Sequence, residues 1–428
     1  MLNPGIARSY TSISTSSRFW SRVRVQIGGG LLFAVVLPIF VLTLFDPQGA
    51  NTLAAQFTAG GGAFAAFLSV YLFRNISLYP GIKGSSFILP SVLVAYGFTF
   101  LIFMMFRLDY SRVVIISSGA AMLMWLSFAQ SMSERRPSLR VGVVPVGGVG
   151  GLSEVPSLEI NWLAEPILNA EYDLLVADFR ADLSDDWEAF LADCALKGLP
   201  VLHVKQLLET LTGRVEIEHI SENSFGSLIP FMGYLQLRRG FDLISALFVG
   251  VLFSPVFIAI AIAIKLDSPG PVLFRQIRIG HRGQPFSVAK FRTMIVHGHF
   301  DARGDAMTRE NDDRITKVGR FLRRTRLDEL AQILNIVRGE MSWIGPRPEA
   351  EPLSRWYESE LPFYRYRHIV PPGITGWAQV NQGHVFELDQ VMSKLHFDFY
   401  YIKNFSPWLD ALILAKTVHT VVSGFGSK

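Results

Sequence analysis

The stretch Thr325-Arg-Leu-Asp-Glu-Leu-Ala-Gln-Ile-Leu-Asn-Ile-Val-Arg-Gly339 is followed within a few residues by Gly345-Pro-Arg-Pro348. Its apolar side chains recur at helical spacing, at Leu327, Leu330, Leu334 and Val337. Gly339 supplies a stop signal, so the pattern predicts an amphipathic helix. Asp328 and Glu329 then lie next to each other on one turn. The sequence therefore predicts two adjacent carboxylates on this helix.

Cationic side chains are unusually dense around this acidic pair. They are Arg275, Arg278, Arg282, Lys290, Arg292, Arg314, Lys317, Arg320, Arg323, Arg324, Arg326 and Arg347. An isolated Asp-Glu pair is more often a solvated helix face. A basic field with an embedded acidic pair instead suits a polyphosphate substrate, a divalent cation and a carboxylate that acts on phosphorus.

The composition indicates a membrane protein. Half of the 428 residues are hydrophobic, and the mean hydropathy is positive, which is high for an ordinary soluble enzyme. The net charge of +4 is compatible with nucleic-acid binding. In a membrane protein it more often marks cytoplasmic loops, so we expect no nucleic-acid partner. The single cysteine, Cys194, excludes an intramolecular disulfide and is expected to pack as a small apolar residue.

Four apolar segments near the N-terminus are each about long enough to cross a bilayer. They occupy residues 28–45, 52–73, 86–106 and 112–130. Basic residues precede the first segment and follow the second and fourth, which predicts that both ends of the bundle face the cytoplasm. Arg107 and Arg112, in the third loop, weaken this pattern. We assign residues 1–137 to a four-helix transmembrane bundle with a cytoplasmic N-terminus.

Residues 138–222 have the composition of a small Rossmann-like α/β module. Strands are expected at 141–144, 172–177 and 199–204, with a helix at 187–197. The glycine run at 147–151 suggests a dinucleotide site. It does not complete the G-x-G-x-x-G pattern, so a packing or regulatory role is favoured and nucleotide binding stays open.

A fifth apolar stretch, residues 241–264, is either a spanning helix or a re-entrant one. Both of its flanks are basic, which the usual charge asymmetry of a span disfavours. Ser254-Pro255 falls near its middle, where proline removes a backbone hydrogen bond and kinks a helix. A spanning helix would also separate the basic module from any cytoplasmic nucleotide. We therefore expect a bent helix that enters and leaves by the same face.

Residues 238–423 resemble the bacterial sugar transferases, a family of polyprenyl-phosphate phosphoglycosyltransferases. The resemblance rests on eight ordered blocks: Arg239-Gly-Phe-Asp242, Asp267-Ser-Pro-Gly-Pro-Val-Leu-Phe-Arg-Gln276, Lys290-Phe-Arg-Thr-Met294, Asp313-Arg-Ile-Thr-Lys-Val-Gly-Arg-Phe-Leu-Arg323, Leu327-Asp-Glu-Leu330, Met341-Ser-Trp-Ile-Gly-Pro-Arg-Pro-Glu349, Pro372-Gly-Ile-Thr-Gly-Trp-Ala-Gln379 and Asp398-Phe-Tyr-Tyr-Ile402. With the N-terminal bundle and the α/β module, the chain is similar to the long-form, hexose-type members. The resemblance makes residues 223–428 the catalytic α/β domain with its re-entrant helix.

The resemblance implies a reaction and its location. Enzymes of this family transfer a sugar 1-phosphate from a UDP-sugar to undecaprenyl phosphate, release UMP, and begin exopolysaccharide, capsule or O-antigen synthesis. By resemblance, Asp328 is the nucleophile that forms a covalent phosphosugar intermediate. Glu329 is its partner, and both are candidate ligands of Mg²⁺. We expect a bacterial inner (cytoplasmic) membrane enzyme with its catalytic domain in the cytoplasm. A homodimer is a further implication.

The resemblance also names substrate-binding residues. Lys290, Arg292, Arg323 and Arg347 are the candidates for the phosphates or nucleotide, and Arg323 is expected on the helix of Asp328 or its leading turn. The chain departs from the family pattern at Ala331, Ile277 and Gln382, which leaves the sugar open. The rival interpretation is a non-catalytic membrane scaffold or regulator with a nucleotide-sensing α/β module. The intact Asp-Glu pair speaks against it.

Overall fold

The computed structural model describes residues 19–76, 84–134, 139–155, 158–216, 230, 232–295, 314–383 and 387–423. The chain divides into two compact units, Leu2–Gly213 and Arg214–Lys428. The boundary predicted at residue 222 lies outside the described residues, as do Arg8, before the first apolar segment, and Arg135, after the fourth.

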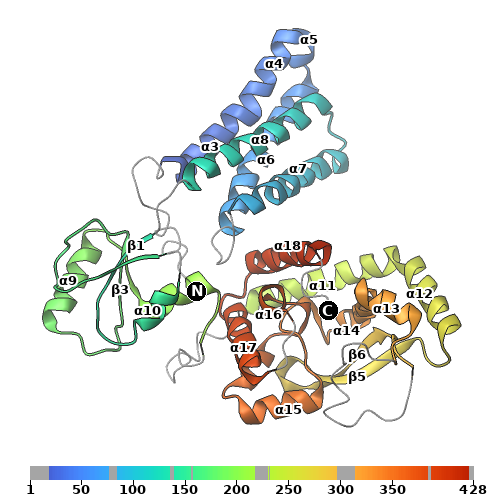
Figure 1. Ribbon diagram of the computed structural model, residues 1–428. Coiled ribbons are helices and arrows are strands. Elements are labelled where there is room, and N and C mark those ends of the chain that lie inside the picture. The colour runs from blue at the N-terminus through green and yellow to red at the C-terminus, as the bar shows by residue number, and fades with distance from the viewer. Residues whose placement is uncertain are drawn as a thin grey trace. The chain divides into compact units, whose positions relative to one another are not determined.

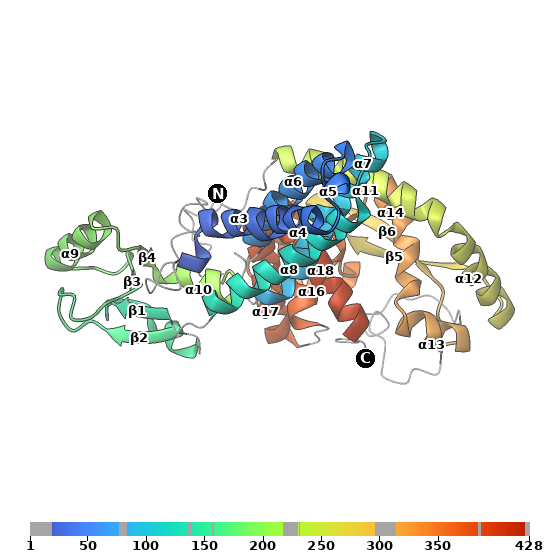
Figure 2. The same cartoon turned by 90° about the horizontal axis from the view of Figure 1, so that it is seen from above.

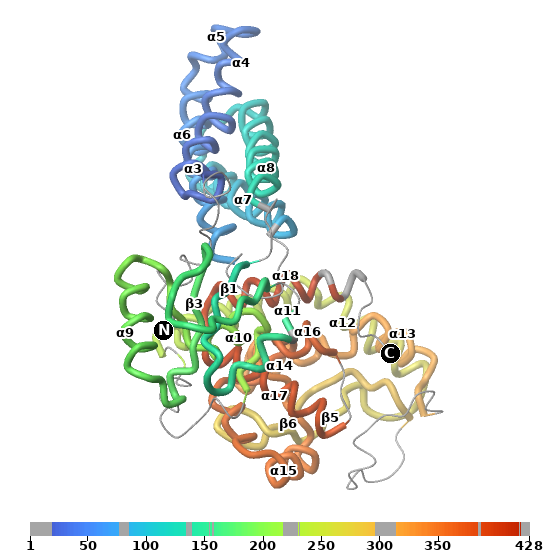
Figure 3. The backbone as a smooth tube through the Cα atoms, turned by 60° about the vertical axis from the view of Figure 1, so that its left-hand side comes forward, coloured from blue at the N-terminus to red at the C-terminus, as the bar shows by residue number. Residues whose placement is uncertain are grey.

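Four long apolar helical segments make up the N-terminal part, as predicted (Figures 1 and 3). The first consists of α3 (Val23–Leu31), the π-helical turn η1 (Leu32–Val36) and α4 (Leu37–Phe45), and the short α5 (Pro47–Ala50) follows it. The others are α6 (Leu53–Ile76), the 3-10 turn η2 (Gly84–Phe87) with α7 (Ile88–Met105), and α8 (Arg112–Glu134). Each is long enough to cross hydrocarbon, which confirms the membrane character of the chain.

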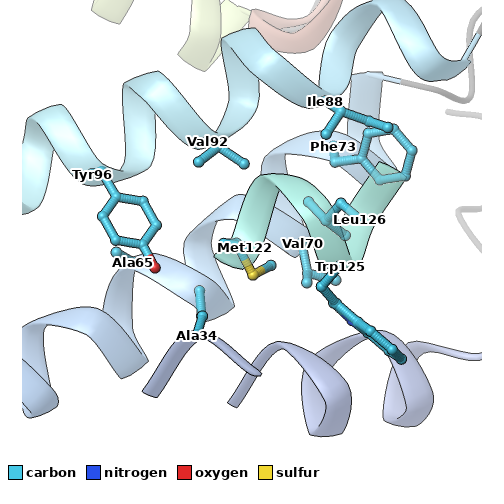
Figure 4. Packing of buried hydrophobic residues seen from close by; sticks show 11 residues of the cluster. Ala34, Ala65, Val70, Phe73, Ile88, Val92, Tyr96, Met122, Trp125 and Leu126 are labelled. Atoms are coloured by element: carbon cyan, nitrogen blue, oxygen red, sulfur yellow. The ribbon is translucent and has the colours of Figure 1, made fainter. Parts of the chain in front are cut away.

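Small residues allow these helices to approach closely. A Cβ atom on Gly29 would lie 1.9 Å from the Trp125 ring, and one on Gly61 would lie 2.4 Å from the Phe103 ring. Figure 4 shows Met122 and Leu126 among the buried side chains between the helices. Helices in lipid gain little from a hydrophobic drive toward one another, so such close packing is a main source of their association.

The α/β module contains a four-stranded parallel sheet of order β2-β1-β3-β4. Its elements are β1 (Leu139–Val143), the 3-10 turn η3 (Gly150–Glu154), β2 (Leu158–Trp162), β3 (Leu174–Ala177), α9 (Asp185–Leu196), β4 (Val201–His203) and α10 (Val204–Thr212). Separate apolar clusters cover the two sheet faces. Cys194 is buried in one of them, as expected. The edge strand β2 was not predicted.

The glycine run after β1 packs against a carboxylate of the same module. Gly147 has φ +83°, and the Gly148 amide donates to Asp178 at 2.9 Å. Asp178 also accepts from the Arg180 amide at 3.1 Å and lies 3.3 Å from the imidazole of His203. Because Asp178 occupies an amide that a phosphate would need, this geometry favours the packing role over a nucleotide site.

The predicted bent helix is present as α11 (Met232–Leu252) and α12 (Ser254–Asp267), which meet at 63° (Figures 1 and 2). The pair is longer than the predicted range of 241–264. Pro255 has no N–H to donate to the carbonyl of Val251, and the Ser254 hydroxyl donates to that carbonyl at 2.8 Å instead. The bend expected from the sequence is confirmed, and the bent pair has the form of a re-entrant helix.

The remainder of the second unit is built from two small sheets and short helices. β5 (Leu273–Ile279) and β6 (Pro285–Phe291) form an antiparallel hairpin around the turn η6 (His281–Gly283), and β7 (Ser342–Ile344) pairs in parallel with β8 (Gly373–Thr375). The helices are α13 (Lys317–Arg324), η7 (Leu327–Gln332), α14 (Ile333–Arg338), α15 (Glu351–Glu360), η8 (Tyr364–Ile369), α16 (Trp377–Gln382), α17 (Leu388–Lys403) and α18 (Pro407–Ser423).

A buried ionic network fixes α11 to this unit. Arg238 donates to the Tyr401 hydroxyl at 2.8 Å and lies 3.3 Å from the carboxylate of Asp410. It also donates to Ser342 in β7, and the Ser342 hydroxyl donates to Asp242 at 2.6 Å. Removing one partner from such a buried pair costs roughly 3–5 kcal/mol. The bent helix is therefore firmly attached to the rest of the unit.

Candidate active site

Asp328 and Glu329 lie in η7, between the ends of two other helices. Arg326 adopts a left-handed conformation with φ 59°, which ends the run of α13 before η7 begins. The adjacent carboxylates predicted from the sequence are present, but the single α-helix expected over 325–339 is instead a 3-10 helix followed by α14. Arg323 consequently lies on α13 and not on the helix of Asp328.

Two cations hold the Glu329 carboxylate. Arg347 donates to both oxygens, at 2.6 and 3.4 Å, and the Lys290 ammonium lies 3.1 Å from one of them. Burial alone would raise the pKa of Glu329, but Arg347 and Lys290 more than reverse this effect and hold the pKa well below its ordinary value. Glu329 is therefore ionised and fixed in place.

Asp328 has a different environment. It is 9% exposed, and within the described part of the chain no group donates a hydrogen bond to its carboxylate. Burial raises its pKa, the charge on Glu329 raises it further, and nearby cations, chiefly Lys290 and Arg323, oppose the shift. One carboxylate of the pair is thus clamped, and the other is unengaged beside it.

Arg323 approaches this pair from α13. Its Nε donates to the Thr293 hydroxyl at 3.0 Å, and a terminal nitrogen lies 3.7 Å from the sulfur of Met294. Its charge lowers the pKa of Asp328. Lys290, Arg323 and Arg347, three of the four predicted substrate-binding residues, are therefore gathered around the acidic pair.

Arg292 is not part of this group. Its guanidinium donates to the carbonyl of Ser268 at 2.6 Å, to the Ser268 hydroxyl at 2.9 Å and to the carbonyl of Pro269 at 2.7 Å. The residue is 3% exposed. These contacts satisfy carbonyl groups at the end of α12, so the geometry gives Arg292 a structural role.

Arg278 was counted among the cations near the acidic pair in the sequence, but it was not predicted to be a site residue. It donates to the carbonyl of Pro348 and to Gln276, at 3.1 Å for the latter. Burial lowers its pKa to about 10, and the charge of Arg347 contributes. A buried guanidinium beside a second one adds positive potential to the site. The feature of the sequence that could have indicated this role is the position of Arg278 near the end of the strand β5, before the hairpin turn.

The loop that carries Arg347 is rigidly held. Gly345 has φ +154°, and a Cβ atom there would lie 2.4 Å from the carbonyl of Pro371. The carbonyl of Arg347 accepts from Arg367 at 2.9 Å, and Arg367 is ion-paired with Asp398 at 2.8 Å. This support fixes the direction from which Arg347 meets Glu329.

The charges in the site do not balance. The cations are Lys290, Arg278, Arg323 and Arg347, and the carboxylates are Asp328, Glu329 and Glu349, the last of which acts on Arg278 and Arg347. The surplus of positive charge suits an anionic ligand such as a diphosphate. Within the described ranges no group of three or more His, Cys, Asp or Glu side chains is arranged so that it could hold a metal ion. Mg²⁺ commonly takes only one or two protein carboxylates together with substrate phosphates, so Asp328 fits such an ion, whereas the Glu329 oxygens are engaged by cations.

Comparisons with known proteins agree with this chemistry. Residues 233–424 match the family model described as bacterial sugar transferase. The chain is 41% identical over 409 residues to the UDP-N-acetylgalactosamine-undecaprenyl-phosphate N-acetylgalactosaminephosphotransferase of Aeromonas hydrophila, covering 93% of this chain and 94% of that protein.

Two further relatives match less than half of this chain. The UDP-glucose:undecaprenyl-phosphate glucose-1-phosphate transferase of Escherichia coli K12 is 46% identical over 184 residues, 42% of this chain and 39% of that protein. The protein of the same name from Caulobacter vibrioides is 39% identical over 200 residues, 46% of this chain and 74% of that protein. The resemblance predicted from the eight blocks is thereby confirmed, and the chain belongs to the bacterial sugar transferase family.

Proposed function

We propose that this enzyme transfers a hexose 1-phosphate from a UDP-sugar to undecaprenyl phosphate and releases UMP. The relatives with the names given above act on UDP-glucose or UDP-N-acetylgalactosamine, and others are named exopolysaccharide production proteins. The observation that carries the proposal is the unengaged carboxylate of Asp328 beside the clamped Glu329. Such an arrangement supplies a nucleophile within a cationic field.

In the first step, an oxygen of Asp328 attacks the phosphorus that bears the sugar. The bond between that phosphorus and the bridging oxygen breaks, and UMP leaves with the electron pair. In the second step, a phosphate oxygen of undecaprenyl phosphate attacks the same phosphorus and displaces the Asp328 carboxylate. The product is a diphosphate-linked lipid sugar. The surrounding cations, including Lys290 and Arg323, reduce the repulsion between the carboxylate and the phosphates.

Asp328 and Glu329 were the predicted ligands of Mg²⁺. We propose that Asp328 and the substrate phosphates hold the ion, which would neutralise charge on the diphosphate. Glu329, held by Lys290 and Arg347, fixes the positions of these two cations. The location that accompanies this proposal is the bacterial inner membrane, with the second unit on the cytoplasmic side where UDP-sugars are found. A homodimer stays a prediction of the family resemblance, to be tested by sedimentation.

The test is UMP release by the full chain in lipid nanodiscs. The parent enzyme is expected to release UMP from one member of a UDP-hexose panel when undecaprenyl phosphate is present. Asp328→Asn keeps the shape of the side chain and removes its nucleophilic charge, so we expect no turnover and no phosphosugar adduct. Residual turnover above a few per cent of the parent would rule out Asp328 as the covalent nucleophile. A parent protein inactive with every UDP-sugar would favour the non-catalytic scaffold.

A further inference from the structure

One face of α16 carries two amide oxygens that lack a hydrogen-bond partner within the described ranges. They are the Oε1 atoms of Gln379 and Gln382, and both are buried. The two residues are three positions apart, so they lie on the same side of the helix. Two such acceptors on one helix face are unusual, because nearly all buried polar atoms in proteins have a partner.

The orientation of both amides is fixed by their other ends. The Gln379 amide nitrogen donates to the carbonyl of Ile374 at 3.1 Å, and that of Gln382 donates to the carbonyl of Gln390 at 2.9 Å. A carbonyl can only accept, so turning either amide over would set two oxygens against each other. The groups that lack a partner are therefore acceptors, and they require a donor.

The intervening amide provides a contrast. The Asn381 side chain accepts from the Lys416 ammonium at 2.8 Å and donates to the carbonyl of Trp377 at 2.8 Å. Asn381 is thus satisfied by the protein itself. The missing partners at Gln379 and Gln382 do not reflect a general shortage of donors around α16.

The first of these acceptors adjoins the loop of Arg347. The Gly345 amide donates to the carbonyl of Thr375 at 2.8 Å. A Cβ atom on Gly376, the residue before α16, would lie 2.2 Å from the Gly345 carbonyl and 3.4 Å from the Gln379 oxygen. Gly345 begins the Gly345-Pro-Arg-Pro348 segment, whose arginine pairs with Glu329. The start of α16 is therefore packed against the active-site loop.

We infer that Gln379 and Gln382 determine substrate specificity by accepting hydrogen bonds from the UDP-sugar. This inference rests on the proposed function. Phosphate oxygens offer no donors and are matched by the cations of the site, whereas the amide oxygens match the parts of a UDP-sugar that carry donors. These are the sugar hydroxyl or amide groups and the uracil imide N–H. A site built to bind such a donor rejects substrates that lack it. Gln382 is also a position at which the chain departs from the family pattern.

The test compares Gln379→Met and Gln382→Met in the full-length enzyme. Methionine keeps the length of the side chain and removes the acceptor. We expect the KM for the preferred UDP-sugar to rise about two- to tenfold in each variant, the effect of losing one neutral hydrogen bond. The unfolding midpoint should fall only slightly, because methionine removes the donor to the carbonyl of Ile374 or Gln390 together with the buried acceptor that has no protein partner. If one variant fails to fold, the other carries the test.

Inhibition by UDP and by UMP shows whether the hydrogen-bond donor belongs to the uracil or to the sugar. Weakening of UDP and UMP binding in parallel with KM assigns the acceptor to uracil, and a change confined to UDP-sugars assigns it to the sugar. Asn381→Leu is the matched control, with an expected loss of stability and an unchanged KM. An unchanged kcat/KM for every UDP-sugar, with unchanged UDP inhibition, would overturn the inference. In that case UMP release by the parent enzyme would still support the proposed function.

Discussion

Replacing Arg347 by methionine removes the shorter of the two ion pairs that hold Glu329. At an effective dielectric constant of about 20, a pair of unit charges 2.6 Å apart attracts by about 6 kcal/mol before desolvation is counted. Lys290, at 3.1 Å, retains about 5 kcal/mol of attraction on the same scale. Loss of one partner from a buried pair costs about 3–5 kcal/mol. Because Lys290 remains, we expect Arg347→Met to lower the free energy of unfolding by about 3 kcal/mol.

The assay is a double-mutant cycle on the full chain in detergent, with unfolding followed by tryptophan fluorescence. Glu329→Gln alone leaves Lys290 and Arg347 close together without their shared anion, so it is also expected to destabilise the fold. In the double variant Arg347 is no longer left without its anion, and only Lys290 still lacks the Glu329 carboxylate. We expect the destabilisation of the double variant to fall short of the sum of the single changes by about 2–3 kcal/mol, within the range seen for contacting residues.

A surface ion pair supplies the control. Arg355 and Glu351 lie 2.7 Å apart on α15, but the arginine side chain is 67% exposed. Arg355→Met should therefore cost less than about 0.5 kcal/mol. Strict additivity of Glu329→Gln and Arg347→Met would show that Arg347 does not act through Glu329, and the clamp would have to be abandoned.

Three other predictions concern the bent helix, the pH dependence of stability and the start of the second unit. With Cys194 changed to Ser, Gln236→Cys and Pro269→Cys should both resist an impermeant thiol reagent on intact cells if α11–α12 is re-entrant, and labelling at 269 alone would mean that the pair spans the membrane. Lys394 holds the pKa of Glu349 at about 2 against the opposing effect of burial. The ionised Glu349 carboxylate therefore contributes stability above about pH 5, and this contribution is lost as the pH falls toward 2. In Glu349→Gln the unfolding midpoint should depend less on pH across this window. A fragment beginning at Arg214 should release UMP and be more stable than a fragment beginning at Gly233. The reason is that Arg214 lies 4.6 Å from the centre of the Phe397 ring and the Val215 amide donates to the carbonyl of His396. Equal stability of the two fragments would show that these contacts contribute nothing.

Hydropathy predicted the four long apolar helices, and the proline of Ser254-Pro255, with its basic flanks, predicted the bend. Both depend on local properties: continuous apolar length in one case and a missing amide hydrogen in the other. The strand β2 escaped prediction because Leu158-Glu-Ile-Asn-Trp162 is a short, half-exposed edge strand, and its polar residues resemble those of a loop. Its pairing with β1 is a long-range contact that periodicity does not reveal.

The acidic pair and its cations were predicted as a group, but their individual contacts were not. Lys290 and Arg292 are two residues apart, and strand alternation would place both on one face. β6 ends at Phe291, so Arg292 leaves the strand and turns to the end of α12. Likewise, nothing in the local sequence shows that Arg326 becomes left-handed and separates Arg323 from the helix of Asp328. These outcomes depend on packing between distant segments.

The bent helix and the active site are joined through a short series of buried contacts. Arg238 of α11 donates to Ser342 and to the carbonyl of Ile344, at the two ends of β7. Arg347 follows three residues after Ile344 and pairs with Glu329. A shift of α11 along its axis would therefore move β7 and the guanidinium that fixes Glu329. Because lipid phosphates lie at the bilayer interface, an enzyme that acts on them must hold its nucleophile at a defined depth. Under the proposed function, the contacts from Arg238 to Glu329 would link the position of the bent helix to the position of Asp328.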